Sequence, residues 1–173
     1  ETVTLLLPNV KDINAKNNDG ESALTNAVRG ANAEVVTLLL QHGADAHIVN
    51  KDGHNLAYIL VDAYRGAGGR GGRGGNNEHA AAQTSPADDL AAKLTVLKQN
   101  GLELTTPFSD GSTLYHLAVT KNDLNLVKKL AAFGIDINAK DKEGITALHR
   151  AAMLAKNDEI LKYLIAAGAK KDI

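Results

Sequence analysis

The amino-acid sequence predicts an all-α solenoid, in which helix pairs repeat along one axis. An acidic residue followed by Gly opens four similar segments, spaced by 33, 58 and 33 residues: Asp19-Gly20, Asp52-Gly53, Asp110-Gly111 and Glu143-Gly144. Two stretches with helical spacing of apolar residues follow each turn, and a Gly ends the second stretch. One helix pair cannot bury its apolar face alone, so this period indicates that neighbouring pairs stack into a continuous core.

The helices are predicted segment by segment. The first helices are expected at Ser22–Arg29, Asn55–Arg65, Thr113–Thr120 and Thr146–Leu154. The second helices are indicated by the apolar sets Val35, Val36, Leu39 and Leu40; Leu90, Leu94 and Leu97; Leu124, Val127 and Leu130; and Ile160, Leu161 and Leu164. They are expected to stop at Gly43, Gly101, Gly134 and Gly168. Small residues on the first helices should let neighbouring helices approach closely: Ala27, Ala118, Ala151 and Ala152.

Composition limits the function classes. The chain has 173 residues and a formal net charge of -1, so it lacks the basic excess of a general nucleic-acid or anionic-membrane surface. It has 0 Cys, which excludes thiolate catalysis, disulfides and cysteine metal sites. No apolar run approaches the ~20 residues of a membrane span. Aromatic residues make up only 3%, so Leu, Ala, Val and Ile must build the core.

Two motifs carry a resemblance to a known family. Gly144-Ile145-Thr146-Ala147-Leu148-His149-Arg150-Ala151-Ala152 is close to G-x-T-P-L-H-x-A-A, and Gly43-Ala44-Asp45 matches the start of the connector G-A-D-x-N-A-x-D. The chain therefore resembles the ankyrin repeat family. The family's Pro is missing throughout, so Ser, Thr or Asn should cap the helices instead.

The resemblance implies a single ankyrin-repeat domain over residues 1–173. We expect a partial repeat at 1–18 and repeats at 19–51, 52–109, 110–142 and 143–173, with an insertion at about 66–87 in the second full repeat. Neither end carries an obvious polar cap, so we expect a fragment of a longer array. The compartment is not indicated by the sequence.

The Gly-rich insertion separates the two helices of one repeat. The first of them is expected to continue through Tyr64 and Arg65, and the second to start early, with Ser85 as its cap, Pro86 in its first position and Asp88 in a capping box. Four interpretations of the tip stay open. It is a tolerated flexible insertion, a partner-contacting loop, an RNA-binding segment through Arg70 and Arg73, or a phosphate loop of the form G-x-G-x-x-G over residues 66–71.

No catalytic or metal-binding motif is present. The six histidines show no metal-ligand spacing, and no G-x-S-x-G or G-x-x-x-x-G-K-[ST] occurs. His116 and His149 stand at the family's His position, where the resemblance implies a side chain that ties one turn to the next by hydrogen bonds. We therefore expect no catalytic residue, no metal and no cofactor.

The candidate binding surface follows from the position of each residue in the repeat. Turn tips and first helices line one concave side, which is the usual protein-recognition surface of the family that the chain resembles. The candidates are Asn18, Asp19, Glu21, Lys51, Asp52, His54, Phe108, Ser109, Asp110, Ser112, Lys142, Glu143 and Ile145, with Arg70 and Arg73 in the insertion. Phe108 replaces a usually polar connector residue, and Tyr58 is a second rare aromatic nearby; either could pack or bind.

These features favour a non-catalytic protein–protein interaction module that binds an unidentified protein partner through its concave face. The insertion could widen that surface. We expect a monomer that contacts neither nucleic acid nor membrane. Two alternatives stay open: a regulatory or targeting module of a larger enzyme, and weak RNA binding through the Arg-Gly tip.

Overall fold

The computed structural model describes residues 12–64, 86–154 and 158–170. Their elements, in chain order, are α2 (Ala23–Gly30), α3 (Ala33–Gln41), α4 (Leu56–Ala63), α5 (Pro86–Gln99), α6 (Leu114–Thr120), α7 (Leu124–Leu130), the 3-10 helix η2 (Ala131–Phe133), α8 (Ala147–Leu154) and α9 (Asp158–Ala166). The predicted all-α architecture is confirmed, because the described residues hold helices joined by turns and an isolated bridge between Val49 and Asn55.

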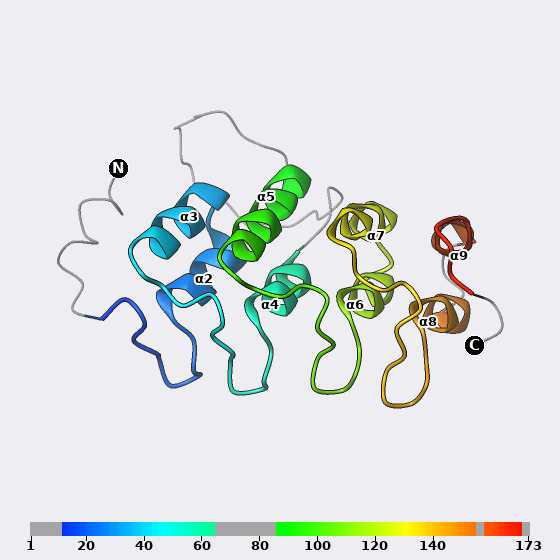
Figure 1. Cartoon of the computed structure of the whole chain (residues 1–173), viewed down its shortest axis with the longest axis horizontal. Helices are drawn as coiled ribbons and strands as arrows, with labels where there is room; N and C mark the ends of the chain where they lie inside the picture. The colour runs from blue at the N-terminus through cyan, green and yellow to red at the C-terminus, as the bar shows by residue number, and fades with distance from the viewer. Residues whose placement is uncertain (1–11, 65–85, 155–157, 171–173) are drawn as a thin grey trace, which may run out of the picture.

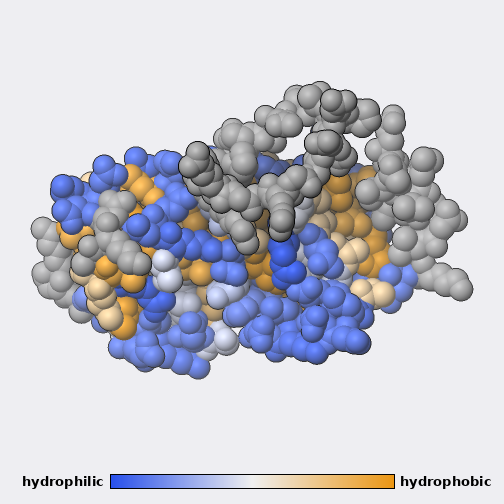
Figure 2. Space-filling model, turned by 180° about the vertical axis from the view of Figure 1, so that it is seen from behind, coloured by the Kyte–Doolittle hydropathy of each residue, from blue (hydrophilic) through white to orange (hydrophobic). Residues whose placement is uncertain are grey.

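The helix pairs stand side by side in one row (Figure 1). The first helices pack in series, α2 on α4, α4 on α6 and α6 on α8, and form one layer. The second helices α3, α5, α7 and α9 form the other layer, while the turns project from the opposite edge of the row. Figure 2 shows hydrophilic residues gathered along that projecting edge. The solenoid therefore presents a polar edge built from turns that lie far apart in the sequence.

Polar side chains start the helices, as the missing Pro predicted. The Ser22 hydroxyl accepts from Thr25 N at 3.3 Å, and the Asn55 side chain accepts from Tyr58 N at 2.9 Å. His116 Nδ1 accepts from Thr113 N at 3.1 Å. Each cap satisfies a backbone N–H that has no partner inside its helix. The first helices therefore begin one residue later than predicted, because the predicted first residue is the cap.

Two sets of Gly residues shape the turns. All four predicted helix stops have positive φ, and so do the four Gly residues of the acidic-Gly turns. Gly111 is the most constrained of them, because a Cβ there would lie 2.9 Å from the backbone N of Lys142. That same N donates to Asp110 O at 3.0 Å. Neighbouring turns therefore approach closely enough at this point to exclude any side chain.

The helices beside the insertion differ from the prediction in one respect. α4 ends at Ala63, whereas it was expected to continue through Tyr64 and Arg65. Tyr64 leaves the helix with φ -62° and ψ 123°, and its half-buried ring still packs against the core from this extended backbone. α5 starts at Pro86, as predicted, and has 14 residues, against 9 or fewer in the other described helices. Residues 65–85, with Ser85, and the side chain of Asp88 lie outside the described residues.

Leucine dominates the core, as the low aromatic content predicted. The largest fully buried side chains of the described residues are aliphatic apart from His116: Leu24, Val28, Leu56, Leu90, Leu94, Leu97, Leu114, Leu126, Leu130, Ile160 and Leu164. Ala27, Ala118 and Ala151 are buried between helices, where small side chains permit close packing. Ala152 was expected among them but is exposed, because it lies about 100° around α8 from the buried Ala151.

A buried ion pair fixes α5 to the helix pair before it. Lys93 Nζ lies 2.7 Å from Asp89 Oδ2, and its side chain is only 6% exposed. Lys93 Nζ also lies 3.4 Å from Val28 O, near the end of α2, and Asp89 Oδ1 accepts from Ala33 N, at the start of α3, at 2.8 Å. The pair therefore satisfies backbone groups at both ends of the α2–α3 loop.

Leu130→Ala should lower the free energy of unfolding by roughly 2–5 kcal/mol, because it leaves a cavity at a fully buried position of α7. Urea unfolding of both proteins would measure the difference. Leu124→Ala, at a half-buried position of the same helix, is the control and should cost less. Equal losses in the two variants would contradict this account of the core.

Asp89→Asn should lower the free energy of unfolding by about 3–5 kcal/mol, because it leaves the Lys93 ammonium buried without a counter-charge. The Asn side chain can still accept from Ala33 N, so the cap is kept. Adding Lys93→Met should recover most of the loss in the same urea titration, since no unpaired charge then remains. A double variant as unstable as Asp89→Asn would refute the explanation.

Candidate functional site

In the turns along the polar edge, one short polar side chain accepts two hydrogen bonds from the backbone of the turn; it is called here the turn organiser. Asn50 Oδ1, for example, accepts from Asp52 N at 3.0 Å and from His54 N at 2.9 Å. Asn17 Oδ1 accepts in the same way from Asp19 N and Glu21 N, both at 2.9 Å. Asp141 Oδ1 accepts from Glu143 N at 3.1 Å and from Ile145 N at 2.8 Å. A short oxygen-bearing side chain at this position therefore holds the tip of the turn together.

Phe108 occupies that position in the remaining described turn. Its backbone repeats the geometry of Asn50: Phe108 N donates to Ser112 O and Gly111 N donates to Phe108 O, both at 2.8 Å. Its side chain cannot accept, so Asp110 takes over part of the role and accepts from Ser112 N at 3.0 Å and from Ser112 Oγ at 2.7 Å. The turn thus keeps its shape although an aromatic ring replaces the organiser.

The freed ring joins an aromatic cluster of His54, Tyr58 and Phe108. The Phe108 ring meets Tyr58 edge to face, with centroids 5.0 Å apart and an angle of 86°. Tyr58 stacks on His54 at 3.7 Å and 7°. All three side chains are half-buried. The cluster joins α4 to the connector that leads into α6. Tyr58 and Phe108 therefore pack against neighbouring rings and still keep part of their surface exposed.

A groove lies beside this cluster on the first helices. It has a volume of about 610 Å³ and is called here the Tyr58 groove. Its lining consists of Glu21, Arg29, Asn50, Asp52, His54, Tyr58, Ile59, Asp62 and Ala63. The volume is in the range of pockets that hold small ligands. The turn before α2, helix α2, the turn before α4 and helix α4 all contribute to it.

Carboxylates outnumber cations in the groove. Glu21 is paired with Arg29, whose Nη2 lies 2.6 Å from Glu21 Oε1, and the Arg29 hydrogen bond lowers the pKa of Glu21 against the effect of burial. Asp62 lies 3.3 Å from Lys121 Nζ. Burial raises the pKa of the Tyr58 hydroxyl, and the nearby carboxylates of Asp62, Asp110 and Asp52 add to this shift. Carboxylates therefore lie near the Tyr58 hydroxyl, and two of those in the groove, Glu21 and Asp62, are paired with cations.

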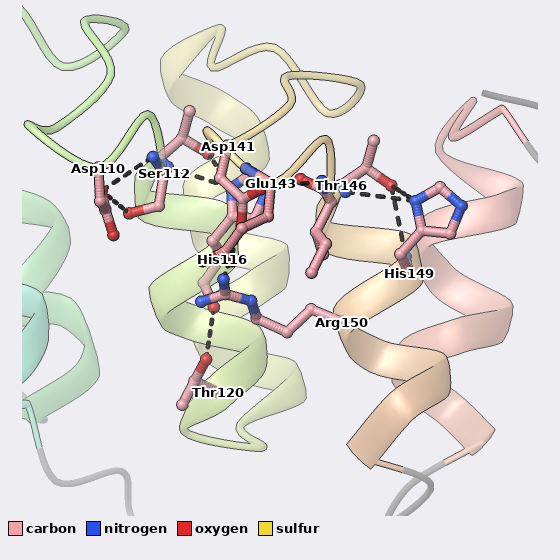
Figure 3. A network of polar contacts seen from close by, with 11 residues as sticks. Asp110, Ser112, His116, Thr120, Asp141, Glu143, Thr146, His149 and Arg150 are labelled. Atoms are coloured by element: carbon pink, nitrogen blue, oxygen red, sulfur yellow. Dashed lines mark hydrogen bonds and ion pairs between the residues drawn. The ribbon is translucent and has the colours of Figure 1, made fainter.

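A second polar network links the last two turns (Figure 3). His116 is buried, and its Nε2 donates to Ile145 O of the following turn at 2.9 Å, while its Nδ1 accepts from Thr113 N. The prediction that this His ties one turn to the next is confirmed. Arg150 Nη2 lies 2.8 Å from the buried Asp141 Oδ2. This network fixes the turns to α6 and α8.

The predicted surface residues divide by exposure. Eight are exposed: Asn18, Asp19, Lys51, Asp52, Ser109, Asp110, Lys142 and Glu143. Glu21, His54, Phe108 and Ile145 are half-buried. Ser112 is the exception, since it is buried and donates its hydroxyl proton to Asp110, so it has no free face for a partner. Arg70 and Arg73 lie outside the described residues, and RNA binding through them stays a prediction.

The structure brings Asp52, His54 and Phe108 together around Tyr58, whereas Lys142, Glu143 and Ile145 belong to a separate turn. Arg29 and Asp62 were missed by the sequence analysis, although both line the groove. The sequence could have suggested them in part, because both are charged residues near the end of a first helix. Which charged positions face the groove depends on how helices α2 and α4 pack.

The family model described as ankyrin repeats (3 copies) matches residues 1–64 and 79–173. The chain belongs to the ankyrin repeat family. Ankyrin repeats are generally protein–protein interaction modules, and such domains are typically non-catalytic. The structure agrees with this assignment, because its helix pairs stack in a row and its turns project from one edge (Figure 1).

Curated proteins with similar ankyrin repeats are diverse. The chain is 32% identical over 142 residues to the nuclear factor NF-kappa-B p105 subunit of Gallus gallus, with 80% of this chain and 12% of that protein covered. It is 31% identical over 175 residues to an intracellular phospholipase A2 of Caenorhabditis elegans, with 91% and 16% covered. It is 36% identical over 76 residues to protein phosphatase 1 regulatory subunit 27 of Homo sapiens, with 44% and 49% covered. The chain thus spans less than half the length of each of these relatives.

Two further observations concern metal sites and membranes. Within residues 12–64, 86–154 and 158–170, no three His, Asp or Glu side chains are grouped as a metal ion would need. None of the helices in these ranges is long and apolar enough to cross a bilayer.

Acidification should destabilise this ankyrin domain through His116. Burial is the main cause that lowers the pKa of His116 below its ordinary value of 6.5; Arg150 also lowers it, while Asp141, Asp110 and the bond to Ile145 raise it. Between its folded and unfolded pKa values, the unfolded chain binds the proton more readily. The stabilisation is therefore complete above pH 6.5 and declines as the pH falls through 6.5 toward the folded-state pKa.

Urea unfolding at pH 7.5 and pH 5.5 would measure this loss. The variant His116→Asn removes the titrating group, so it should lose less stability between the two pH values than the native chain does. Equal losses in both proteins would assign the pH dependence to other groups.

Proposed function

We propose that this ankyrin domain binds a partner protein, without catalysis, through its turn tips and first helices. The proposed surface comprises Asn18, Asp19, Glu21, Arg29, Lys51, Asp52, His54, Tyr58, Asp62, Phe108, Ser109, Asp110, Lys142, Glu143 and Ile145. It adds Arg29, Tyr58 and Asp62 to the surface predicted from the sequence. It leaves out the buried Ser112, and also Arg70 and Arg73, which lie outside the described residues.

The single observation that carries the proposal is the exchange of the turn organiser for Phe108. In the three other described turns, an Asn or Asp side chain at this position makes two hydrogen bonds that hold the tip. Phe108 gives up both bonds and leaves an aromatic side chain half-exposed on a polar edge. Nothing in the shape of the turn requires this, because its backbone bonds are those of Asn50. Aromatic side chains are enriched at protein interfaces and often carry much of the binding energy once a partner covers them.

Rigid turns support the same proposal. The turns before α6 and α8 are tied together by two direct bonds, one from Lys142 N to Asp110 O and one from His116 Nε2 of α6 to Ile145 O. Connectors are joined as well: the Asn14 amide donates to Gly43 O at 3.1 Å, and Asp45 N donates to Asn14 Oδ1 at 2.8 Å. A surface that is already ordered loses little entropy on binding.

A second candidate is a regulatory or targeting module within a larger enzyme. Its support is that the chain matches 16% of the length of an intracellular phospholipase A2. In this case the same surface would contact either the catalytic part or its target. The binding proposal covers both situations, and only the identity of the partner differs.

Phe108→Asn should separate binding from folding, because it restores the side chain that Asn17 and Asn50 supply in their turns. The ring contact that is lost and the turn bonds that are gained are of similar size, so the free energy of unfolding should change by less than about 1 kcal/mol. Binding to the partner should weaken by at least about 10-fold.

The partner would be captured from the native source with the immobilised chain, and its dissociation constant would then be measured by calorimetry. Glu34→Gln, an exposed change on the second helix α3, is the control and should leave binding intact. If Phe108→Asn and the native chain bind the captured protein equally, the proposed surface is wrong.

A further inference from the structure

We propose that the Tyr58 groove and the adjoining aromatic cluster receive a cationic side chain, Lys or Arg, from a segment of the partner protein. The cation would lie against the cluster of His54, Tyr58 and Phe108, between the carboxylates of Asp52 and Asp110. This inference rests on the proposed function and specifies the chemistry of the partner.

The aromatic cluster supplies an attractive surface for a cation. Tyr58 contacts both other rings, His54 by stacking at 3.7 Å and Phe108 edge to face at 5.0 Å, so two cation-attracting rings, Tyr58 and Phe108, lie side by side. A Lys or Arg head group near such rings gains cation–π energy, and the gain grows when water is excluded. The groove next to the rings, with a volume of about 610 Å³, provides room for the apolar stem of that side chain.

The balance of charge selects the sign of the occupant. Arg29 is the cation in the lining, and Glu21 compensates it at 2.6 Å. Lys121, outside the lining, compensates Asp62 at 3.3 Å. Asp52 lines the groove, and Asp110 lies two residues after Phe108 in the same turn. Neither carboxylate forms an ion pair with any residue that the structure describes, although Arg150 lowers the pKa of Asp110 from a greater distance. These two carboxylates are what a bound cation would neutralise.

The cost of desolvation also favours a cationic occupant. A partner that covers the cluster removes water from Asp52 and Asp110. Without a counter-charge, that loss opposes binding, and a carboxylate of the partner would add repulsion. A Lys or Arg side chain replaces the lost water with charge-assisted hydrogen bonds. Charge complementarity therefore favours a basic segment over a neutral or acidic one.

The test uses dodecapeptides selected from a random phage-displayed library on the full chain. The selected peptides should share a Lys or Arg at one position. Replacing that residue by norleucine should weaken binding, measured by fluorescence anisotropy, by at least about 10-fold. Binding should also weaken as the salt concentration rises.

The matching change on the protein is Asp52→Asn with Asp110→Asn. The Asn at 110 can still accept from Ser112, so the turn is preserved. This variant should bind the peptides at least about 10-fold more weakly. The control is Glu34→Gln with Asp158→Asn, which removes the same charge from helices α3 and α9 and should leave affinity within about twofold.

Peptides that share no basic residue, share an acidic one, or bind the Asp52→Asn/Asp110→Asn variant at native affinity would overturn the inference. If those same peptides still lose binding to Phe108→Asn, the proposed binding surface stands and only the cationic chemistry is wrong. If Phe108→Asn also leaves their binding unchanged, the proposed function fails as well.

Discussion

The structure depends on one constraint: a helix pair of this size has an apolar face that it cannot cover by itself. Leu126 and Leu130 of α7, for example, are fully buried only because α6 and the neighbouring pairs cover them. Stacking in series solves the problem and requires a repeated unit, which recurs after 33 residues on either side of the repeat that carries the insertion. The tips of the turns on the polar edge lie outside this core. Their exposed side chains can therefore differ from repeat to repeat without exposing the core.

Local signals allowed most of this fold to be predicted. The caps at Ser22 and Asn55 and the Gly stops act on backbone groups within a few residues, so their effect can be read from adjacent sequence. The end of α4 could not be predicted in this way. Its apolar spacing continues to Tyr64, but the ring reaches the core from an extended backbone as well as from a helix. Periodicity alone does not distinguish the two.

The site was predicted only in part, for a related reason. Position within the repeat identified Asp52, His54 and Phe108, because the turns follow one pattern. The burial of Ser112, the lining of the groove by Arg29 and Asp62, and the bonds from Asp89 to Ala33 N and from Lys93 to Val28 O depend on how the helices pack. No periodic rule specifies which partner a charged side chain meets once helices have packed. Those features required the three-dimensional arrangement.

The aromatic cluster has a mechanical consequence. Tyr58 belongs to α4, while Phe108 belongs to the connector before α6, so their edge-to-face contact joins a first helix to the connector that leads into the next helix pair. Any bend of the solenoid at this joint changes the distance and tilt between the two rings. The affinity of a ligand that contacts both rings would consequently depend on the local curvature of the array. Such a ligand, once bound, would oppose bending at this joint.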